Sequence, residues 1–114
     1  VSTYYNADIK ESLYKGRHWV QICEEILDQL GNKVYISFDI DGLSPEFCPN
    51  TGTPVPGGLS FDEASFLLAQ MPRFKKKVIG FDLCEVAPGE NSELDANIGM
   101  RLLYKLCGCA LTCQ

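Results

Sequence analysis

The sequence predicts an α/β fold in which a parallel sheet packs against helices. Segments with the apolar spacing of helices alternate along the chain with two short runs rich in β-branched and aromatic residues. These runs, 33–38 and 77–83, have little polar alternation, which is typical of strands covered on both faces. Because a helical crossover returns the chain to the same end of a sheet, we expect the two strands to run parallel.

The first predicted helix lies near residues 17–30. Its apolar residues recur at spacings of three and four, and Gly31 stands where such a helix ends. The residues with this spacing are Trp19, Ile22, Cys23, Ile26, Leu27 and Leu30. The first strand follows directly, near 33–39. Residues 1–16 have a mixed character that predicts no element.

The second predicted helix lies near residues 61–71 and has clear signals at both ends. Ser60 and Glu63 fit a capping box, in which each side chain bonds to the backbone of the other residue. Pro72 marks the end of the helix, because proline cannot continue it. The glycine-rich segment before Ser60 therefore leads the chain directly into this helix.

The chain continues with a second strand near 77–83 and a third helix near 95–107, which we expect Gly108 to end. Two strands alone leave both outer edges of a sheet unpaired. We therefore expect further strands from another part of a longer chain or from a partner. Since the first residue is Val1, we expect residues 1–114 to be a piece of a protein or a processed chain.

Composition excludes several classes of protein. The 114 residues suit one domain, and their net charge of -5 opposes binding to nucleic acid and to anionic lipid. The mean hydropathy is -0.04, and no apolar run could span a bilayer, so we expect no membrane insertion. The six cysteines are irregularly spaced and include no CxxC pair, which favours a reducing, cytoplasmic location over a disulfide framework or a zinc site.

Carboxylates follow both predicted strands. Asp39 and Asp41 lie at the end of the first strand, and Glu85 follows the second. Open α/β sheets bind ligands at this edge, and side chains at i and i+2 of an extended backbone point the same way. Carboxylate oxygens suit Mn²⁺ or Mg²⁺, so the pattern indicates a metal site, although Asp-x-Asp also occurs in turns and caps. Asp82, inside the second strand, is expected to be structural.

The segment behind the aspartates, "PNTGTPVPGG", is rich in glycine and proline. Glycine permits turns and proline fixes them, so a rigid connection and a ligand-binding loop are both open interpretations. The segment is not a P-loop, because the Gly-Lys-Ser/Thr step is missing. An EF-hand is also excluded, since Gly42 falls at the fourth loop position rather than the sixth, and Asn50 stands at the twelfth.

Three stretches in order, "SFDIDGLSP", "PNTGTPVPGG" and "GFDLCEVAP", resemble the ureohydrolases, the arginase, agmatinase and formiminoglutamase family. The resemblance covers about residues 33–107. It implies a three-layer α/β/α parallel-sheet fold, incomplete here, with residues 1–114 as the C-terminal portion of a single domain. It also implies a homo-oligomer, a trimer or hexamer, with two Mn²⁺ ions that activate water. The substrate would be a guanidino compound, arginine- or agmatine-like, which releases urea, or a formimino compound, which releases formamide.

The resemblance also implies roles for four residues. Asp39 matches the aspartate that bridges both ions, and Asp41 matches one that binds the second ion. Glu85 matches the catalytic glutamate that faces the guanidinium. Thr53 falls at the loop position that lines the substrate pocket, and a hydroxyl that only caps a turn is an equal alternative. The chain departs from the family pattern at Ser44, where a third aspartate is usual.

Two earlier motifs of the family, a glycine-rich segment with Asp-His and a stretch of the form D-A-H-x-D, do not occur in residues 1–114. They carry the other metal ligands. His18, the only histidine, has no neighbouring aspartate and is expected at the surface or at a helix cap. We therefore expect this chain alone to be inactive. The alternative is a non-catalytic half-domain that binds a metal or docks on another subunit.

Overall fold

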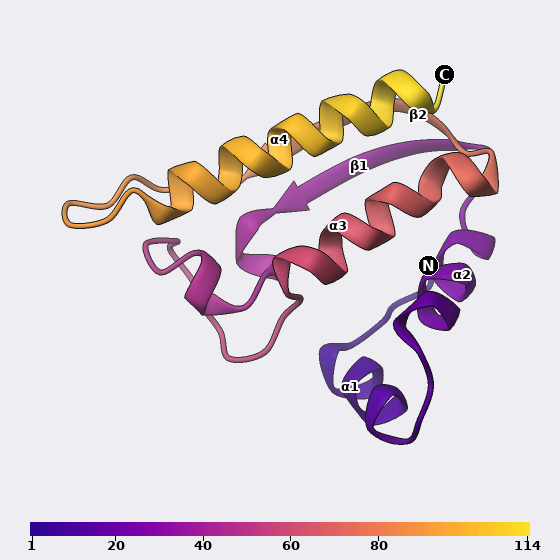
Figure 1. The fold of residues 1–114 in the computed structure, drawn as a ribbon, viewed down its shortest axis with the longest axis horizontal. Coiled ribbons are helices and arrows are strands. Elements are labelled where there is room, and N and C mark those ends of the chain that lie inside the picture. The colour runs from indigo at the N-terminus through magenta and orange to yellow at the C-terminus, as the bar shows by residue number, and fades with distance from the viewer.

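The computed structural model describes residues 1–114 and consists of two parallel strands packed against helices (Figure 1). The strands are β1 (Lys33–Asp39) and β2 (Lys77–Cys84), and the helices are α1 (Asn6–Tyr14), α2 (Trp19–Asp28), α3 (Phe61–Gln70) and α4 (Leu94–Thr112). Short 3-10 turns, η1 to η3, cover Ile40–Gly42, Pro45–Phe47 and Met71–Phe74. The predicted α/β fold is confirmed, and α1 is an additional element. None of the helices has the length and apolar character needed to cross a membrane.

The two strands pair in parallel along their whole length. Lys33 lies opposite Lys77, and Asp39 lies opposite Cys84. A bulge after Val34 lets the register skip one residue of β2. Both strands therefore end at the same edge of the sheet, as the sequence predicted.

The helices cover one face of this sheet. Val34, Ile36 and Phe38 pack in the apolar clusters beneath the helices, whereas Tyr35 and Ser37, which alternate with them, are exposed on the opposite face. Helices α3 and α4 contact each other, and α4 packs along β2. The expectation that both faces of the strands are covered is therefore wrong for this chain, because no element packs on the second face.

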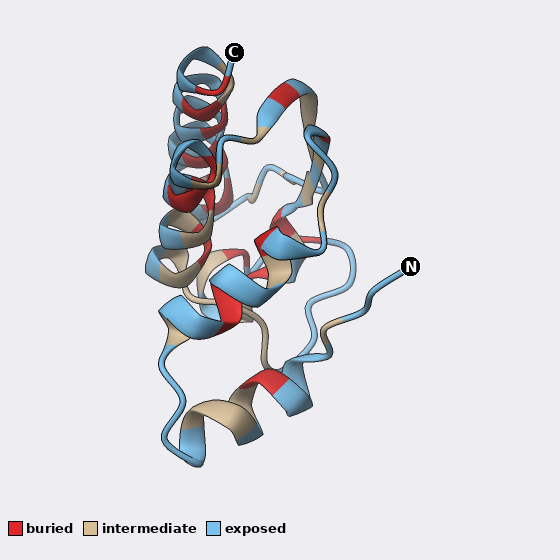
Figure 2. Cartoon of the chain, turned by 90° about the vertical axis from the view of Figure 1, so that its right-hand side faces the viewer, coloured by how far each residue is buried: buried red, intermediate tan, exposed pale blue.

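The core has two parts, and Figure 2 shows that α4, the helix that leads to the C-terminus, carries its buried residues on the side that faces the rest of the chain. The first part packs α2 and α4 on the beginning of both strands and contains Leu27, Val34, Met71, Val78, Cys109 and Cys113. The second part lies beyond the end of β1 and contains Ile40, Leu43, Cys48, Ala64 and Leu102. Burial of these side chains holds the backbone that follows β1 in a defined position.

The local sequence signals predict the start of α3 correctly but predict the end of α4 wrongly. Glu63 donates its N–H to Ser60 Oγ at 2.9 Å, and Ser60 donates its N–H to Glu63 Oε1 at 3.0 Å, so the predicted capping box is confirmed. The expectation that Gly108 ends the last helix is wrong, because α4 continues to Thr112. Beyond the glycine, Cys109 is buried in the core, and this packing outweighs the low helix propensity of glycine.

Candidate metal and substrate site

Two carboxylates line an open pocket at the end of β1. Asp39 is the last residue of the strand, and Asp41 lies in the turn η1 that follows. The expectation of an extended backbone through both residues is wrong, because the 3-10 turn intervenes. Both residues nevertheless line the same pocket, which has a volume of about 500 Å³.

Both side chains have the chemistry of metal ligands. Their oxygens are the ligands that Mn²⁺ and Mg²⁺ prefer. Within residues 1–114, no three His, Cys, Asp or Glu side chains form a group that could hold a metal ion. Asp39 and Asp41 therefore fit a metal centre as two of its ligands and not as the full set.

Thr53 reaches the pocket from the glycine- and proline-rich loop. It is among the residues that line the pocket, and its hydroxyl donates a hydrogen bond to Asp41 Oδ2 at 2.9 Å. The hydroxyl therefore lies at the pocket, and its role in binding a substrate stays a prediction. A hydrogen bond to an ionised oxygen restrains the carboxylate. Thr53 therefore limits the orientations that the side chain of Asp41 can adopt.

Glu85 lies at the end of the neighbouring strand and does not line this pocket. Its backbone has a φ of 65°, which is uncommon for a residue other than glycine. Its carbonyl accepts a hydrogen bond from the Thr51 hydroxyl at 3.0 Å. Such backbone conformations persist where the surroundings hold them. The structure thus brings Asp39, Asp41 and Thr53 together and leaves Glu85 beside them.

The glycine- and proline-rich loop is closed at its base by backbone hydrogen bonds. Ser44 donates its N–H to the Leu59 carbonyl at 2.8 Å, and Leu59 donates its N–H to the Gly42 carbonyl at 3.0 Å. Gly58 has a φ of 86°, and a Cβ there would lie 2.7 Å from the carbonyl carbon of Leu43. This position therefore requires glycine. Ser44 ties the loop to the end of β1 through its backbone.

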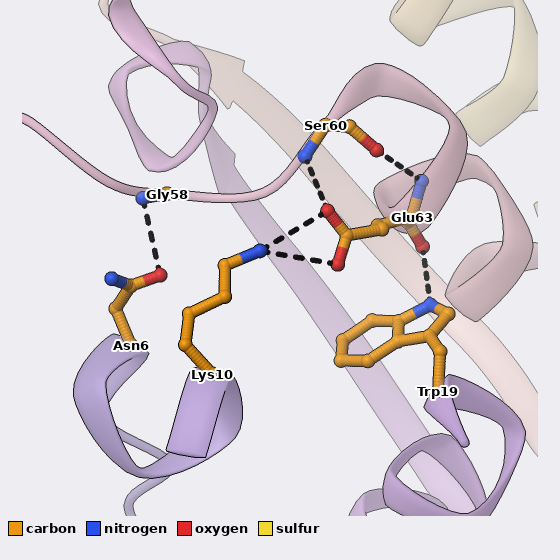
Figure 3. Close-up of polar contacts among 6 residues, drawn as sticks. All are labelled: Asn6, Lys10, Trp19, Gly58, Ser60 and Glu63. Carbon is orange, nitrogen blue, oxygen red and sulfur yellow. Dashed lines mark hydrogen bonds and ion pairs between the residues drawn. The ribbon is translucent and has the colours of Figure 1, made fainter. Parts of the chain in front are cut away.

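Helices α1 and α2 contact the end of this loop and the first turn of α3 (Figure 3). Asn6 Oδ1 accepts a hydrogen bond from the Gly58 N–H at 3.2 Å, and Lys10 Nζ lies 3.4 Å from Glu63 Oε1 in an ion pair. Trp19 Nε1 donates to the Glu63 carbonyl at 3.0 Å. The contacts of Asn6 and Lys10 with this distant segment stabilise α1, whose only buried residue is Ile9 and whose sequence carries little helical signal.

The start of the loop is held by a residue that the sequence did not single out. Asp95, in the first turn of α4, is completely buried, and its carboxylate accepts hydrogen bonds from Asn50. An acidic residue in the first turn of a helix is common because the helix dipole favours it. For this reason the sequence pattern alone gives Asp95 no special meaning.

Asp82 is held on the open face of the sheet by β1. The hydroxyls of Ser37 and Tyr35 donate to its two carboxylate oxygens at 2.9 and 3.0 Å. These bonds, from Ser37 first and then Tyr35, lower the pKa of Asp82 below its ordinary value of 3.8. In turn, the hydrogen bond to Asp82 raises the pKa of Tyr35 and also that of Cys84. The network links the two strands, which supports the structural role predicted for Asp82.

His18 and the cysteines do not line the pocket. His18 is the exposed N-cap residue of α2, and its backbone N–H donates to Gln21 Oε1 at 2.8 Å. All six cysteines are free thiols. Burial raises the pKa of Cys23 to about 11 and that of Cys109 to about 12, so these two thiols stay protonated near neutral pH.

The sequence is similar to those of known enzymes. Residues 8–109 match the model of the arginase family. An N(1)-aminopropylagmatine ureohydrolase of Thermus thermophilus is 42% identical over 86 residues, which cover 75% of this chain and 28% of that protein. An agmatinase of Serratia proteamaculans is 45% identical over 76 residues, which cover 62% of this chain and 24% of that protein. The chain thus spans about a quarter of the length of these curated relatives.

The fold is also similar to that of a solved enzyme. The proclavaminate amidino hydrolase from Streptomyces clavuligerus superposes with a TM-score of 0.85 at 28% sequence identity. The match covers 100% of this chain and 36% of that chain. All the helices and strands described above therefore have counterparts in one part of a larger fold.

Proposed function

This chain belongs to the arginase family, and from that premise we propose that it supplies one part of the metal and substrate site of a ureohydrolase. We propose further that residues 1–114 form the C-terminal portion of a single domain. The observation that carries the proposal is the pocket at the end of β1, which Asp39, Asp41 and Thr53 line together. In a family of hydrolases, two carboxylates on one pocket support a metal-dependent reaction.

In the proposed complete site, Asp39 would be a ligand of two Mn²⁺ ions and Asp41 would be a ligand of one of them. The resemblance to the family and the oxygen donors of both side chains support this assignment. Manganese, when bound, would lower the pKa of water and polarise the substrate. The residues of this chain would contribute negative charge at the pocket, and the hydrogen bond from Thr53 would orient the carboxylate of Asp41. The other ligands would come from outside residues 1–114.

The proposed substrate is a small guanidino or formimino compound. The relatives are named for agmatine-like and amidino compounds, which supports this substrate class. Glu85 follows β2, next to the strand that ends at Asp39, and a carboxylate pairs well with a planar guanidinium through charge-assisted hydrogen bonds. Hydrolysis of the C–N bond would give an amine and urea from a guanidine, or an amine and formamide from a formimino compound.

Assembly and location stay predictions. We propose a homo-oligomer, a trimer or a hexamer, in the cytoplasm. Exposed apolar side chains on α4, those of Met100, Tyr104 and Leu111, offer a surface suited to contacts with the rest of a longer chain or with another subunit. The size of the native particle, measured by light scattering, tests the oligomeric state.

The test of the proposed function is hydrolysis by the protein expressed from its full reading frame. The protein is loaded with Mn²⁺ and incubated with agmatine, arginine or formiminoglutamate, and urea and formamide are measured. Release that depends on Mn²⁺ supports the proposal. Residues 1–114 alone should release neither product, because Asp39 and Asp41 supply only part of a metal site. No release by the manganese-loaded full protein would instead favour the alternative, a non-catalytic half-domain that docks on another subunit.

A further inference from the structure

A buried carboxylate anchors the loop of the candidate site to α4. Asp95 has an exposed fraction of 0%, and its carboxylate accepts hydrogen bonds from both the backbone N–H and the side-chain amide of Asn50. The Asn50 N–H lies 3.1 Å from Oδ2, and the Asn50 Nδ2 lies 2.8 Å from Oδ1. Burial of a carboxylate is unfavourable unless the charge is hydrogen-bonded. The buried carboxylate of Asp95 therefore needs the hydrogen bonds from Asn50, and these bonds in turn fix the position of Asn50.

The side chain of Asn50 fits between α4 and the segment that precedes it. Its Nδ2 group also lies 3.4 Å from the Ser92 carbonyl, to which it donates. A Cβ at Gly89 would lie 2.4 Å from the same Nδ2 atom. The backbone at Gly89 therefore lies against the side chain of Asn50, and a larger residue at this position would collide with it. Asn50 is held on several sides, which makes it a firm attachment point.

The residues that follow Asn50 in the loop contact both strand ends. The Thr51 side chain is buried, and its hydroxyl donates to the Glu85 carbonyl at 3.0 Å. Two residues later, the Thr53 hydroxyl donates to Asp41 at 2.9 Å. A displacement of the loop at Asn50 would therefore reach the backbone after β2 and a proposed metal ligand after β1.

We propose that Asp95 is a positioning residue for Glu85 and Thr53 and acts through Asn50 and Thr51. The proposal rests on the proposed function, because it assigns Asp95 a role in the same site. Asp95 does not line the pocket and touches neither metal nor substrate in this assignment. It fixes the loop that sets the backbone at Glu85 and the position of the Thr53 hydroxyl. Small displacements of such groups lower turnover strongly.

The test compares Asp95→Asn with Glu93→Gln in the protein expressed from its full reading frame. Asp95→Asn keeps the shape of the side chain but replaces one acceptor oxygen with an NH₂ group that faces the donors of Asn50. Glu93 is the exposed N-cap residue of α4, and its side chain makes no hydrogen bond to the loop, so Glu93→Gln is a matched control. Asn50→Ala removes the side-chain half of the contact and serves as a second variant.

Two quantities are measured. The first is kcat/KM for Mn²⁺-dependent urea release from agmatine, which should fall about ten- to a hundredfold in Asp95→Asn, mainly through kcat, and by a smaller factor in Asn50→Ala. The second is hydrogen exchange of the backbone amides of residues 50–53, which should be faster in both variants. Glu93→Gln should match the wild type in both measurements. If Asp95→Asn does not fold, the same two measurements on Asn50→Ala test the proposal.

A merely structural role predicts a different result. It would lower the melting temperature and leave kcat of the folded, manganese-loaded protein unchanged, and that result would overturn the proposal. If the wild-type protein releases no urea, the proposed function fails, and hydrogen exchange still tests the anchor. In that case, exchange at residues 50–53 that is equal in Asp95→Asn and in the wild type would overturn it.

Discussion

The hydroxyl of Thr53 lies 2.9 Å from a carboxylate oxygen of Asp41 and donates a hydrogen bond to it. The two residues come from different parts of the pocket, since Asp41 belongs to η1 after β1 and Thr53 belongs to the glycine- and proline-rich loop. Through this contact the loop restrains one of the two proposed metal ligands. The position of the loop and the affinity for metal should therefore change together.

Thr53→Val should weaken the binding of Mn²⁺ to the protein expressed from its full reading frame. Valine has the shape of threonine but donates no hydrogen bond, and loss of this exposed contact should cost about 1 kcal/mol, or about fivefold in affinity. Calorimetric titration with Mn²⁺ measures the effect. Thr112→Val is the matched control, since the Thr112 hydroxyl donates to the Gly108 carbonyl within α4. Equal affinities of Thr53→Val and the wild type would count against the role of Thr53.

Glu85→Gln should impair hydrolysis and leave the Mn²⁺ content unchanged. Its proposed role is to face the cationic substrate, where a charge-assisted hydrogen bond contributes about 1.5–3 kcal/mol, so kcat/KM should fall about ten- to a hundredfold. Urea release from agmatine measures the loss. Glu90→Gln removes an exposed carboxylate from the following segment and should have no effect. Unchanged kinetics in Glu85→Gln would show that this side chain points elsewhere in the complete site.

Gly58→Ala should destabilise the protein more than Gly16→Ala. Gly58 and Gly16 have positive φ angles of 86° and 96°, so alanine at either position should lower the free energy of unfolding by a similar amount, about 1–2 kcal/mol, through backbone strain. A Cβ at Gly58 would also lie 2.7 Å from the Leu43 carbonyl carbon, whereas a Cβ at Gly16 has nothing within 4 Å. We expect an additional loss of about 1–3 kcal/mol in Gly58→Ala, measured by denaturant unfolding. Equal losses in the two variants would mean that the loop base is not tightly packed.

Asp82→Asn should reduce the loss of stability in acid. Hydrogen bonds from Ser37 and Tyr35 lower the pKa of Asp82 in the folded protein below 3.8. A carboxylate with a lowered folded pKa stabilises the fold above its unfolded pKa, and this contribution is lost as the pH falls through the folded pKa. Between about pH 5 and pH 2, the wild type should therefore lose more unfolding free energy than Asp82→Asn. The control Asp62→Asn changes an exposed carboxylate in the first turn of α3. Identical pH profiles for the wild type and Asp82→Asn would rule out this contribution.

Much of the fold could be predicted because its signals are local. The strand expected near 33–39 and the helix expected near 61–71 correspond to β1 and to α3, since a β-branched run and a capping box act over a few residues. The helix expected near 17–30 is shorter, Trp19–Asp28, and the helix expected near 95–107 is longer, Leu94–Thr112. Tertiary packing of residues beyond Gly108 extends this last helix, and local propensity does not show such packing.

The candidate site, like the fold, could be predicted from the sequence only in part. Asp39 and Asp41 follow a recognisable strand, so their place at a strand end could be predicted from their spacing. The contact between Thr53 and Asp41 depends on how the loop folds back toward β1, and the spacing of the residues in the sequence does not predict it. The Asn50–Asp95 pair joins residues 45 positions apart, and neither residue belongs to a pattern that predicts the other. Contacts of this kind become visible only in the folded chain.

The proposed role of Asp39 and Asp41 is tested most directly by the manganese content of the protein expressed from its full reading frame. The wild type, Asp39→Ala, Asp41→Ala and the control Asp62→Ala are loaded with Mn²⁺, dialysed and analysed for bound metal. We expect two ions per chain in the wild type and in Asp62→Ala, fewer in Asp41→Ala, and the fewest in Asp39→Ala, because the proposed bridging ligand contacts both ions. Two retained ions in Asp39→Ala, or none in the wild type, would contradict the assignment of this pocket as a manganese site.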